Sequence, residues 1–278
     1  MKLVRFGEKG KEKPGLYKDG NVVDLRKLFP EIPDIGERFF RENWLEKIAG
    51  VQEPGQKIKD RIGCPIHQPS KIICLGKNYA EHAKEGGFEN PDRPLIFCKT
   101  VNTLNGPFDS IILPKSSGKI DWEVELAIII GKEGKRISKA QARDYIAGFT
   151  VMNDVSGREA QFSDSQWFRG KSFDGFAPAG PLMVTPDEIG DVNNLRITAT
   201  VDGKIMQDGN TRDMIFDVYT IIEDISEDIT LIPGDIISTG TPAGVGIFRD
   251  PPVVLKPGNV VECYVENIGT IVNKVVNE

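Results

Sequence analysis

Three carboxylates alternate along one stretch of the chain, Asp121-Trp122-Glu123-Val124-Glu125, and an apolar run over residues 126–130 follows them. Successive side chains of a β-strand point to opposite faces, so Asp121, Glu123 and Glu125 would share one face. Stacked like charges need a cation or protons, and carboxylate oxygens are the ligands that hard divalent metal ions prefer. The pattern therefore predicts a metal site, although a half-buried strand with a solvated acidic end would look the same.

A carboxylate and an imidazole three residues apart form a second candidate. His82 and Glu85 lie in residues 76–87, which read as a short helix closed by Gly86-Gly87. Residues at this spacing share a helical face, and a carboxylate beside an imidazole orients it and raises its basicity. The pair suits a general base acting on water. An exposed ion pair on a polar helix would have the same spacing.

Asp154 follows a predicted strand over residues 146–152, in the segment Asn153-Asp154-Val155-Ser156-Gly157-Arg158-Glu159. Ser156 and Glu159 have the spacing of a capping box, in which each side chain bonds a free backbone N–H at the start of a helix. Asp154 has no such duty, so it is either a site residue at a strand end or a simple turn residue.

Two lysines and a glycine loop could bind an anion. Lys99 ends an apolar strand, and Lys171 lies among aromatic residues; either could bind a substrate carboxylate or an enolate oxygen, or could be an ordinary surface residue. The segment 238–246 contains three glycines, including Gly240, which allow close backbone approach. Its consecutive N–H groups could hold a carboxylate, or the segment could be a purely structural turn.

These residues need a scaffold, and most of the predicted elements are strands. From residue 71 onward we expect strands over 72–75, 95–98, 111–113, 122–130, 146–152, 182–184, 195–201, 236–238, 260–265 and 268–272. Helices are predicted over 38–48, 79–85, 139–145 and 216–225. Strands this numerous and irregularly spaced favour a β-rich α+β sandwich or roll over a regular alternation of strand and helix.

Two domains are predicted. Residues 1–65 contain two short strand candidates, over 3–6 and 21–25, and the first predicted helix, so they would form a small N-terminal α/β domain. Residues 66–278 would form the larger domain. Prolines and glycines gather between residues 50 and 69, as is typical of a connector.

The composition restricts the partners. The 278 residues include 39% hydrophobic and 27% charged side chains, as in a globular protein with a substantial core, and the net charge is −6. An acidic chain with a pI near 5.2 is a poor non-specific ligand of nucleic acid. No apolar run approaches the ~20 residues that span a bilayer. The N-terminus lacks a signal-peptide pattern and the four cysteines lack metal-site spacing, so we expect a cytoplasmic protein with reduced thiols.

The order of the motifs is more specific than any one of them. Six follow one another: Gly76–His82, Phe97–Lys99, Glu123–Leu126, Asn153–Glu159, Lys171–Asp174 and Pro233–Gly246. Over residues 70–273 this series closely resembles the fumarylacetoacetate hydrolase family. The resemblance implies a catalytic domain built as a mixed β-sandwich roll, which is usually a homodimer. It also implies that the N-terminal residues form the small domain of many members.

The resemblance also assigns roles to the candidate residues. It implies one Mg²⁺ or Mn²⁺ per subunit, bound by Glu123, Glu125 and Asp154, and it leaves Asp121 as a neighbour of the metal site. It implies a water-activating dyad of His82 and Glu85 on a lid helix, and a substrate-facing lysine at Lys171. The residues expected to bind substrate are Lys99, Arg158, Gln161, Gly240 and Thr241.

The implied substrate is a small anionic 2-oxo or 2,4-dioxo acid. We expect a metal-dependent hydrolase that cleaves the C–C bond of a 2,4-dioxo acid, such as an acylpyruvate, and releases an enolate such as that of pyruvate. The same site could instead serve an oxaloacetate decarboxylase or a 2-hydroxyhepta-2,4-diene-1,7-dioate isomerase. A non-catalytic binding protein that keeps the fold is a further alternative.

Overall fold

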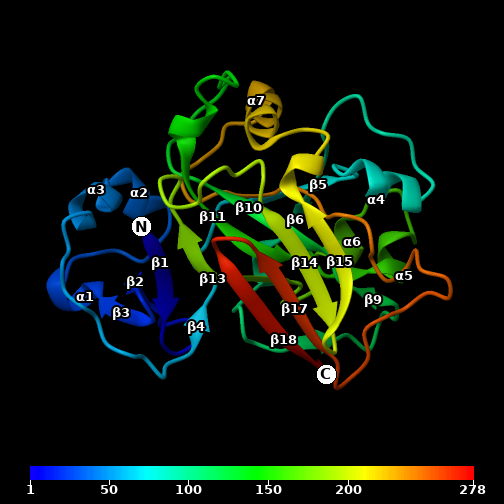
Figure 1. Cartoon of the computed structure of the whole chain (residues 1–278), viewed down its shortest axis with the longest axis horizontal. Helices are drawn as coiled ribbons and strands as arrows, with labels where there is room; N and C mark the ends of the chain where they lie inside the picture. The colour runs from blue at the N-terminus through cyan, green and yellow to red at the C-terminus, as the bar shows by residue number, and fades with distance from the viewer.

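A large curved sheet and a smaller one carry the fold of the computed structural model, which describes residues 1–278 (Figure 1). The path through the large sheet runs β3-β2-β1-β13-β11-β10-β16-β5-β6, with β4 paired to β1 and β7 to β13. Its strands are β1 (Lys2–Phe6), β2 (Lys13–Lys18), β3 (Asn21–Asp24), β4 (Ile62–Gly63), β5 (Ile72–Gly76), β6 (Leu95–Lys99), β7 (Leu104–Asn105), β10 (Val124–Ile130), β11 (Ile146–Asn153), β13 (Ala177–Val184) and β16 (Ile236–Ser238).

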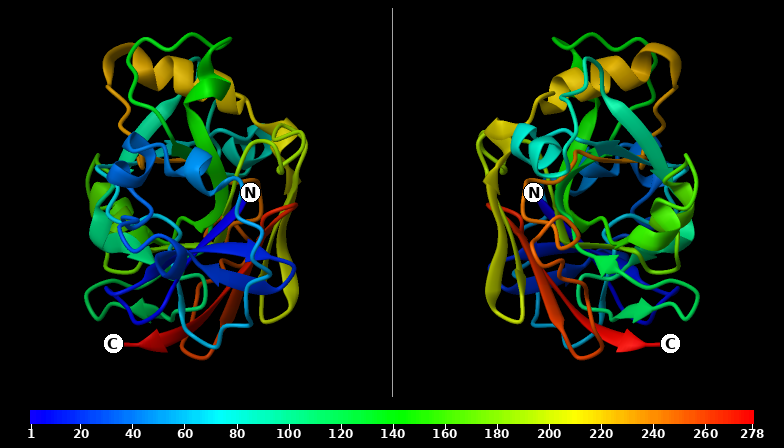
Figure 2. Two further views of the ribbon diagram at one scale, coloured as in Figure 1. Left: turned by 90° about the vertical axis from the view of Figure 1, so that its left-hand side faces the viewer. Right: turned by 90° about the vertical axis from the view of Figure 1, so that its right-hand side faces the viewer.

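The smaller sheet has the order β15-β14-β17-β18-β8 and packs against the large one. Its strands are β8 (Ile111–Leu113), β14 (Arg196–Val201), β15 (Lys204–Asn210), β17 (Val260–Val265) and β18 (Gly269–Asn277). A two-stranded ribbon pairs β9 (Ile120–Asp121) with β12 (Ser156–Gly157). In the side views of Figure 2 the strands curl around a common centre, so the predicted β-rich roll is confirmed.

The helices are short and lie outside the sheets (Figures 1 and 2). They are α1 (Leu25–Leu28), α2 (Glu37–Arg41), α3 (Trp44–Ile48), α4 (Ala80–Glu85), α5 (Arg158–Gln161), α6 (Phe168–Lys171) and α7 (Val218–Asp228), with 3₁₀ turns at Val101–Thr103, Ala142–Tyr145 and Thr211–Asp213. None of these helices has the length and apolar composition that crossing a bilayer would need.

Strand β10 is buried along its whole length, and its alternating side chains separate two hydrophobic cores. Val124, Leu126 and Ile128 belong to the core that the two sheets share. Ala127 and Ile129 belong to the core beneath the N-terminal helices. Glu123 and Glu125 alternate in step with Ala127 and Ile129, so their side chains point to the same face of the strand as these two residues.

Strand β16 closes the centre of the large sheet. It pairs antiparallel with β10, with Ile237 opposite Ile128, and parallel with β5, with Ile237 opposite Ile73. Strands β5 and β6 are thus joined to β10 only through a strand that comes more than 130 residues later than β6 in the sequence. The glycine loop after β16 is consequently placed beside both β5 and β10.

The N-terminal strands belong to the same large sheet. Strand β1 pairs antiparallel with β13, with Leu3 opposite Met183. Leu3 also packs in one core cluster with Ile72 and Ile129. The predicted division at residue 65 stays a prediction, but the hydrogen-bonded sheet is continuous across it.

Several predicted elements differ in extent. The predicted helix over 38–48 is two short helices, because Asn43 between them has the left-handed φ of 55° that asparagine tolerates better than most residues. The predicted helix over 139–145 is only a 3₁₀ turn at its end. The acidic strand begins at Val124 rather than Trp122, because Asp121 pairs with Ser156 in a separate ribbon.

The capping-box prediction was wrong. Gly157 occupies the N-cap of α5 without a side-chain bond. The Ser156 hydroxyl instead donates to the Asp154 carbonyl at 2.9 Å, and the Glu159 carboxylate accepts from the Gly118 amide at 2.9 Å. The box fails because α5 begins at Arg158, so that Ser156 lies one residue before the N-cap position.

A buried ion network fastens the N-terminal strands to the rest of the chain. The Arg5 guanidinium donates to Asp34 through two nitrogens, each at 2.7 Å, and lies 3.2 Å from Glu12. Glu12 in turn accepts from Arg61 at 2.6 Å, and Arg61 also binds Asp109. The network therefore links β1, the connector and the loop after β7.

Replacing Arg5 with methionine should destabilise the whole chain by about 3 kcal/mol, because it leaves buried carboxylates without a partner. Guanidinium unfolding would measure this, with Lys11→Met, which removes an exposed pair with Glu8, as the control expected to show no change. An Arg5→Met variant as stable as the control would contradict the importance of the network.

Candidate active site

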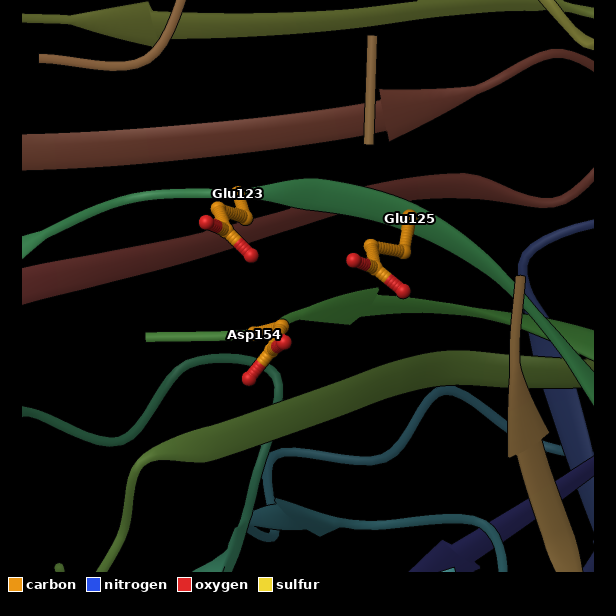
Figure 3. A group of neighbouring side chains, drawn as sticks. All are labelled: Glu123, Glu125 and Asp154. Atoms are coloured by element: carbon orange, nitrogen blue, oxygen red, sulfur yellow. The ribbon is translucent and has the colours of Figure 1, made fainter. Parts of the chain in front are cut away.

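Three carboxylates converge where β10 begins and β11 ends (Figure 3). Val124 lies opposite Asn153 in the ladder, so Glu123, Glu125 and Asp154 are brought side by side, and the Asp154 amide donates to the Glu123 carbonyl at 2.8 Å. One carboxylate oxygen of each lies within 4.8 Å of the others, and all three side chains are buried. We refer to Glu123, Glu125 and Asp154 as the acidic triad.

Two lysine ammonium groups reach the triad from other elements. Lys171, at the end of α6, donates to Glu123 at 2.7 Å and to Asp154 at 2.6 Å. Lys99, at the end of β6, donates to the other oxygen of Asp154 at 2.7 Å and to the Val155 carbonyl at 3.1 Å. Burial by itself would lower the pKa of Lys171, but Asp154 and Glu123 outweigh it and raise the pKa.

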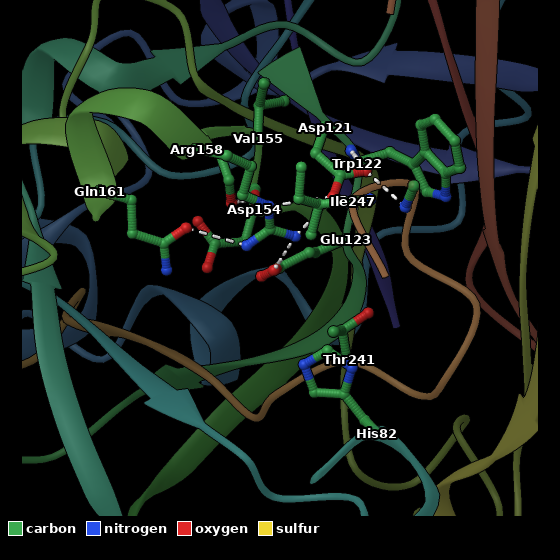
Figure 4. Close-up of polar contacts among 12 residues, drawn as sticks. His82, Asp121, Trp122, Glu123, Asp154, Val155, Arg158, Gln161, Thr241 and Ile247 are labelled. Atoms are coloured by element: carbon green, nitrogen blue, oxygen red, sulfur yellow. Dashed lines mark hydrogen bonds and ion pairs between the residues drawn. The ribbon is translucent and has the colours of Figure 1, made fainter. Parts of the chain in front are cut away.

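Arg158 is the third buried cation. Its Nη2 lies 2.7 Å from both Glu123 and Asp121, and its Nη1 donates to the Gln161 side-chain oxygen at 2.9 Å (Figure 4). Burial opposes ionisation of Glu123, yet Lys171 and Arg158 are close enough to hold the pKa of this carboxyl well below its usual value. Glu123 is therefore an anion at any physiological pH.

Glu125 has no cationic partner. It accepts hydrogen bonds from the Ser238 hydroxyl at 2.5 Å and from the Gly240 amide at 2.9 Å. Burial, followed by the negative charges of Asp154 and Glu123, raises its pKa well above the usual value. Ionised Glu125 therefore needs a further positive charge close by.

The donor set fits a divalent metal ion. Four buried carboxylates, those of Asp121, Glu123, Glu125 and Asp154, face three buried cations, those of Lys99, Arg158 and Lys171. An all-oxygen set of carboxylates is the kind that Mg²⁺ and Mn²⁺ bind. A cation at the triad would relieve the repulsion on Glu125, so the acidic triad could hold the metal that the sequence predicted.

His82 and Glu85 form the predicted pair on α4. The His82 Nδ1 lies 2.9 Å from Glu85, which leaves Nε2 as the free ring nitrogen. Glu85 also accepts from the Gly244 amide through both oxygens, at 2.9 and 3.1 Å. His82 lines the same pocket as Glu123, and Figure 4 shows its ring beside Thr241. The orientation of the imidazole is thus set by the glycine loop.

Asp121 is fully buried and is the main acceptor for that loop. Its oxygens accept from the amides of Trp122 at 2.9 Å, Gly246 at 2.7 Å and Ile247 at 3.0 Å. They also accept from Arg158 through two nitrogens, at 2.9 and 2.7 Å. A Cβ at Gly246 would collide with the Val253 carbonyl oxygen and would lie 2.7 Å from the Asp121 carboxylate, so only glycine fits there. Asp121 thereby connects Arg158 to the loop that holds Glu85.

Gln207, a residue of β15, is a site component that the sequence did not indicate. Its amide donates to the Thr241 hydroxyl and to the Pro242 carbonyl, each at 2.7 Å, and its oxygen accepts from the Val124 amide at 3.0 Å. Thr241 donates its own hydroxyl proton to the Val124 carbonyl at 2.8 Å. The turn at Asp202-Gly203 was a visible hairpin signal from which β15 could have been found.

The pocket in front of the triad changes in character from base to mouth. Glu123, Glu125, Arg158, Lys171 and Thr241 are its buried polar lining. The more exposed rings of Phe88, Phe162 and Phe248 lie farther out, together with Trp167 and Lys77. Gln161 also lines the pocket, whereas the Gly240 amide is engaged by Glu125 and Lys99 lies behind Asp154. The substrate roles of these residues stay predictions.

Comparison with known proteins places the chain among enzymes. Residues 71–276 match the family described as fumarylacetoacetate (FAA) hydrolase, C-terminal. Mitochondrial oxaloacetate tautomerases from Homo sapiens (FAHD2A) and Rattus norvegicus (Fahd2a) are 47% and 43% identical, over 99% of this chain and 92% of each relative. The fumarylacetoacetate hydrolase of Exiguobacterium antarcticum has a TM-score of 0.85 at 35% identity, with both chains covered fully. The 5-carboxymethyl-2-hydroxymuconate delta-isomerase of Mycobacterium smegmatis has a TM-score of 0.80 at 31% identity, again over both full chains.

Asp121→Asn should weaken metal binding about 10- to 100-fold, because an amide in place of the carboxylate misdirects Arg158 and hence Glu123. It should also speed hydrogen exchange at the amides of residues 246 and 247. Titration calorimetry with Mn²⁺ and exchange mass spectrometry measure the two effects. Asp208→Asn, which breaks an exposed pair with Arg196, is the control. Unchanged affinity and unchanged exchange in Asp121→Asn would overturn the role of Asp121.

Glu125→Gln should change how the stability of the metal-free protein depends on pH. Folding raises the pKa of Glu125, so the folded protein holds this proton more tightly than the unfolded chain does. The stability that results is fully present below the ordinary carboxyl pKa and is lost as pH rises toward the raised value. Glutamine does not ionise, so the variant should melt above the wild type in EDTA, by a margin that widens with pH.

Thermal unfolding between pH 5 and pH 8 tests this expectation, with Glu262→Gln outside the site as the control. Added Mn²⁺ should raise the melting temperature of the wild type but not of Glu125→Gln. The opposite result, in which the wild type is more stable than Glu125→Gln in EDTA and increasingly so as pH rises, would show that folding does not raise the pKa of Glu125.

Proposed function

Because the chain belongs to the fumarylacetoacetate hydrolase family, we propose that it catalyses the keto–enol interconversion of a 2-oxo dicarboxylate of the oxaloacetate type. The observation that carries this proposal is a buried acidic triad facing a pocket with a single imidazole, that of His82. Such a site binds an oxyanion at one end and moves a proton at the next carbon. The names of relatives aligned over 99% of the chain support the same reaction.

The triad and its cations would hold the 2-oxo end of the substrate. A Mg²⁺ or Mn²⁺ ion on Glu123, Glu125 and Asp154 would act as a Lewis acid toward the 1-carboxylate and 2-oxo oxygens. Lys171 would stabilise the negative charge that develops on the 2-oxo oxygen. The Gln161 amide nitrogen has no partner within the protein, so it can donate to the substrate.

His82 would carry the proton. Its free Nε2 would take a proton from C3 of the keto form, and the electron pair of that C–H bond would become the C2–C3 double bond. The proton then returns to the 2-oxo oxygen, so one C–H bond breaks and one O–H bond forms. Glu85 stabilises the imidazolium between the two transfers through its contact with Nδ1.

Hydrolysis of a C–C bond in a 2,4-dioxo acid is the second candidate. The observation that favours it is the bond between Glu85 and His82, because the dyad could equally well remove a proton from water. That water would attack the distal carbonyl carbon, and the bond to the 2-oxo acid would break to leave an enolate facing Lys171. Decarboxylation or double-bond isomerisation would use the same oxyanion site.

A homodimer with one metal ion per subunit and a cytoplasmic location are also proposed for this chain. The dimer and the metal rest on the family resemblance, and the oxygen ligands do not separate Mg²⁺ from Mn²⁺. Cell fractionation tests the location, because the relatives named above are described as mitochondrial.

His82→Asn should reduce tautomerisation of oxaloacetate about 100- to 10,000-fold, because it removes the only imidazole of the pocket, to which we assign the proton transfer. The decay of the enol absorbance measures it, in metal-loaded protein, with His67→Asn as the control. Metal affinity should be unchanged in His82→Asn. Full activity of this variant would exclude the proton-transfer role.

The same preparations assayed for pyruvate release from acetylpyruvate distinguish the two candidates. Rapid enol decay with slow pyruvate release supports the tautomerase. The reverse result would establish the hydrolase and overturn the leading proposal.

A further inference from the structure

Lys77 is a pocket cation that no protein carboxylate neutralises. The other two cations of the lining, Arg158 and Lys171, are committed to Glu123 and its neighbours at hydrogen-bonding distance. Lys77 has no ion pair, and its Nζ lies 4.0 Å from the centre of the Phe88 ring. The charge that Lys77 brings to the pocket is therefore available to a ligand.

The backbone at Lys77 is held in place by its neighbour. Lys77 has a left-handed φ of 57°, which costs a non-glycine residue energy and persists only where the surroundings impose it. The next residue, Asn78, is buried and donates to the carbonyls of Phe216 at 3.1 Å and Thr239 at 2.8 Å, while its oxygen accepts from the Phe216 amide at 2.9 Å. The direction in which the Lys77 side chain leaves the loop is consequently fixed.

Lys77 shares one wall of the pocket with the base. The Phe88 ring, over which its Nζ lies, packs edge-to-face with Phe248 at 6.1 Å between centroids. Phe248 in turn lies 6.0 Å from the His82 ring. The ammonium of Lys77 and the imidazole of His82 are thus joined by two packed aromatic rings that line the same pocket.

We propose that Lys77 binds the distal carboxylate of a 2-oxo dicarboxylate and so selects this substrate class. The inference rests on the proposed function, which places the 1-carboxylate and 2-oxo group at the triad and C3 beside His82. In oxaloacetate the second carboxylate is attached directly to C3. If the 2-oxo end binds at the triad and C3 lies beside His82, the carboxylate on C3 also lies close to His82. It therefore faces the pocket wall that His82 shares with Lys77.

A charged group suits this wall better than an apolar one. The Phe88 ring covers one side of the Lys77 ammonium, which strengthens its attraction for an anion. An apolar acyl group in the same place would remove water from the ammonium and supply no partner. A site built around a charged partner discriminates against an analogue that lacks it.

The test compares Lys77→Met with wild-type, metal-loaded enzyme. KM for oxaloacetate should rise about 10- to 100-fold, the loss expected for one charge-assisted hydrogen bond, with a smaller change in kcat. KM for acetylpyruvate, which lacks the distal carboxylate, should change less than twofold. Lys77→Arg should restore part of the oxaloacetate affinity. Lys84→Met, an exposed lysine of α4 outside the pocket, is the matched control.

A binding measurement keeps the inference independent of turnover. Difluoro-oxaloacetate has no proton at C3, so it cannot enolise, whereas oxalate offers only the chelating end. Lys77→Met should weaken difluoro-oxaloacetate binding in calorimetry and leave oxalate binding unchanged. Equal loss for both ligands, or no loss for either, would overturn the role of Lys77. A wild-type enzyme that binds difluoro-oxaloacetate through Lys77 but does not tautomerise oxaloacetate would refute the proposed function and leave the subsite standing.

Discussion

Repulsion among carboxylates buried in one small volume is the constraint around which the rest of this structure is arranged. Each negative charge removed from water must meet a cation, a proton or several hydrogen-bond donors, or folding becomes too costly. The chain supplies these partners from distant parts of the sequence: Lys99 from β6, Arg158 from α5, Lys171 from α6 and backbone amides from the loop after β16. Glu125 alone is left with neutral donors. In this site Asp121, Glu123 and Asp154 therefore have cationic partners within the protein, whereas Glu125 attracts a further cation.

The site divides its work between two groups of residues. Asp121 and Gln207 touch backbone and other protein groups only, and they determine where the triad strand and the glycine loop lie. His82, Lys171 and Lys77 face the pocket, at its centre, its base and its outer wall. The first group explains why a flexible glycine loop can support an ordered catalytic site: its amides are bound by buried carboxylates.

Much of this arrangement could be predicted from the sequence. The alternation of side chains before and along β10, together with the order of the motifs, was enough to place Glu123, Glu125 and Asp154 together. The face to which a strand residue points depends only on its position along that strand, so it can be read from the local sequence. The contacts of Asp121 and Gln207 could not be predicted, since their partners are 125 and 34 residues away in the sequence and include backbone amides that carry no sequence signature. The continuity of the sheet from β1 to β13 was hidden for the same reason. Register between distant strands depends on the packing of the whole core.

The late position of β16 in the sequence has a consequence for synthesis on the ribosome. Strands β5 and β6 emerge early but have no path of hydrogen bonds to β10 until residues 236–238 have been made. The amides that bind Asp121 emerge later still, at residues 246 and 247. The carboxylate of Asp121 thus stays in water until 125 further residues have been made, and non-local pairing of this kind folds slowly. A chain that terminates before β16 lacks the strand that joins β5 to β10, so we expect it to be a substrate for chaperones and proteases rather than a partly active enzyme.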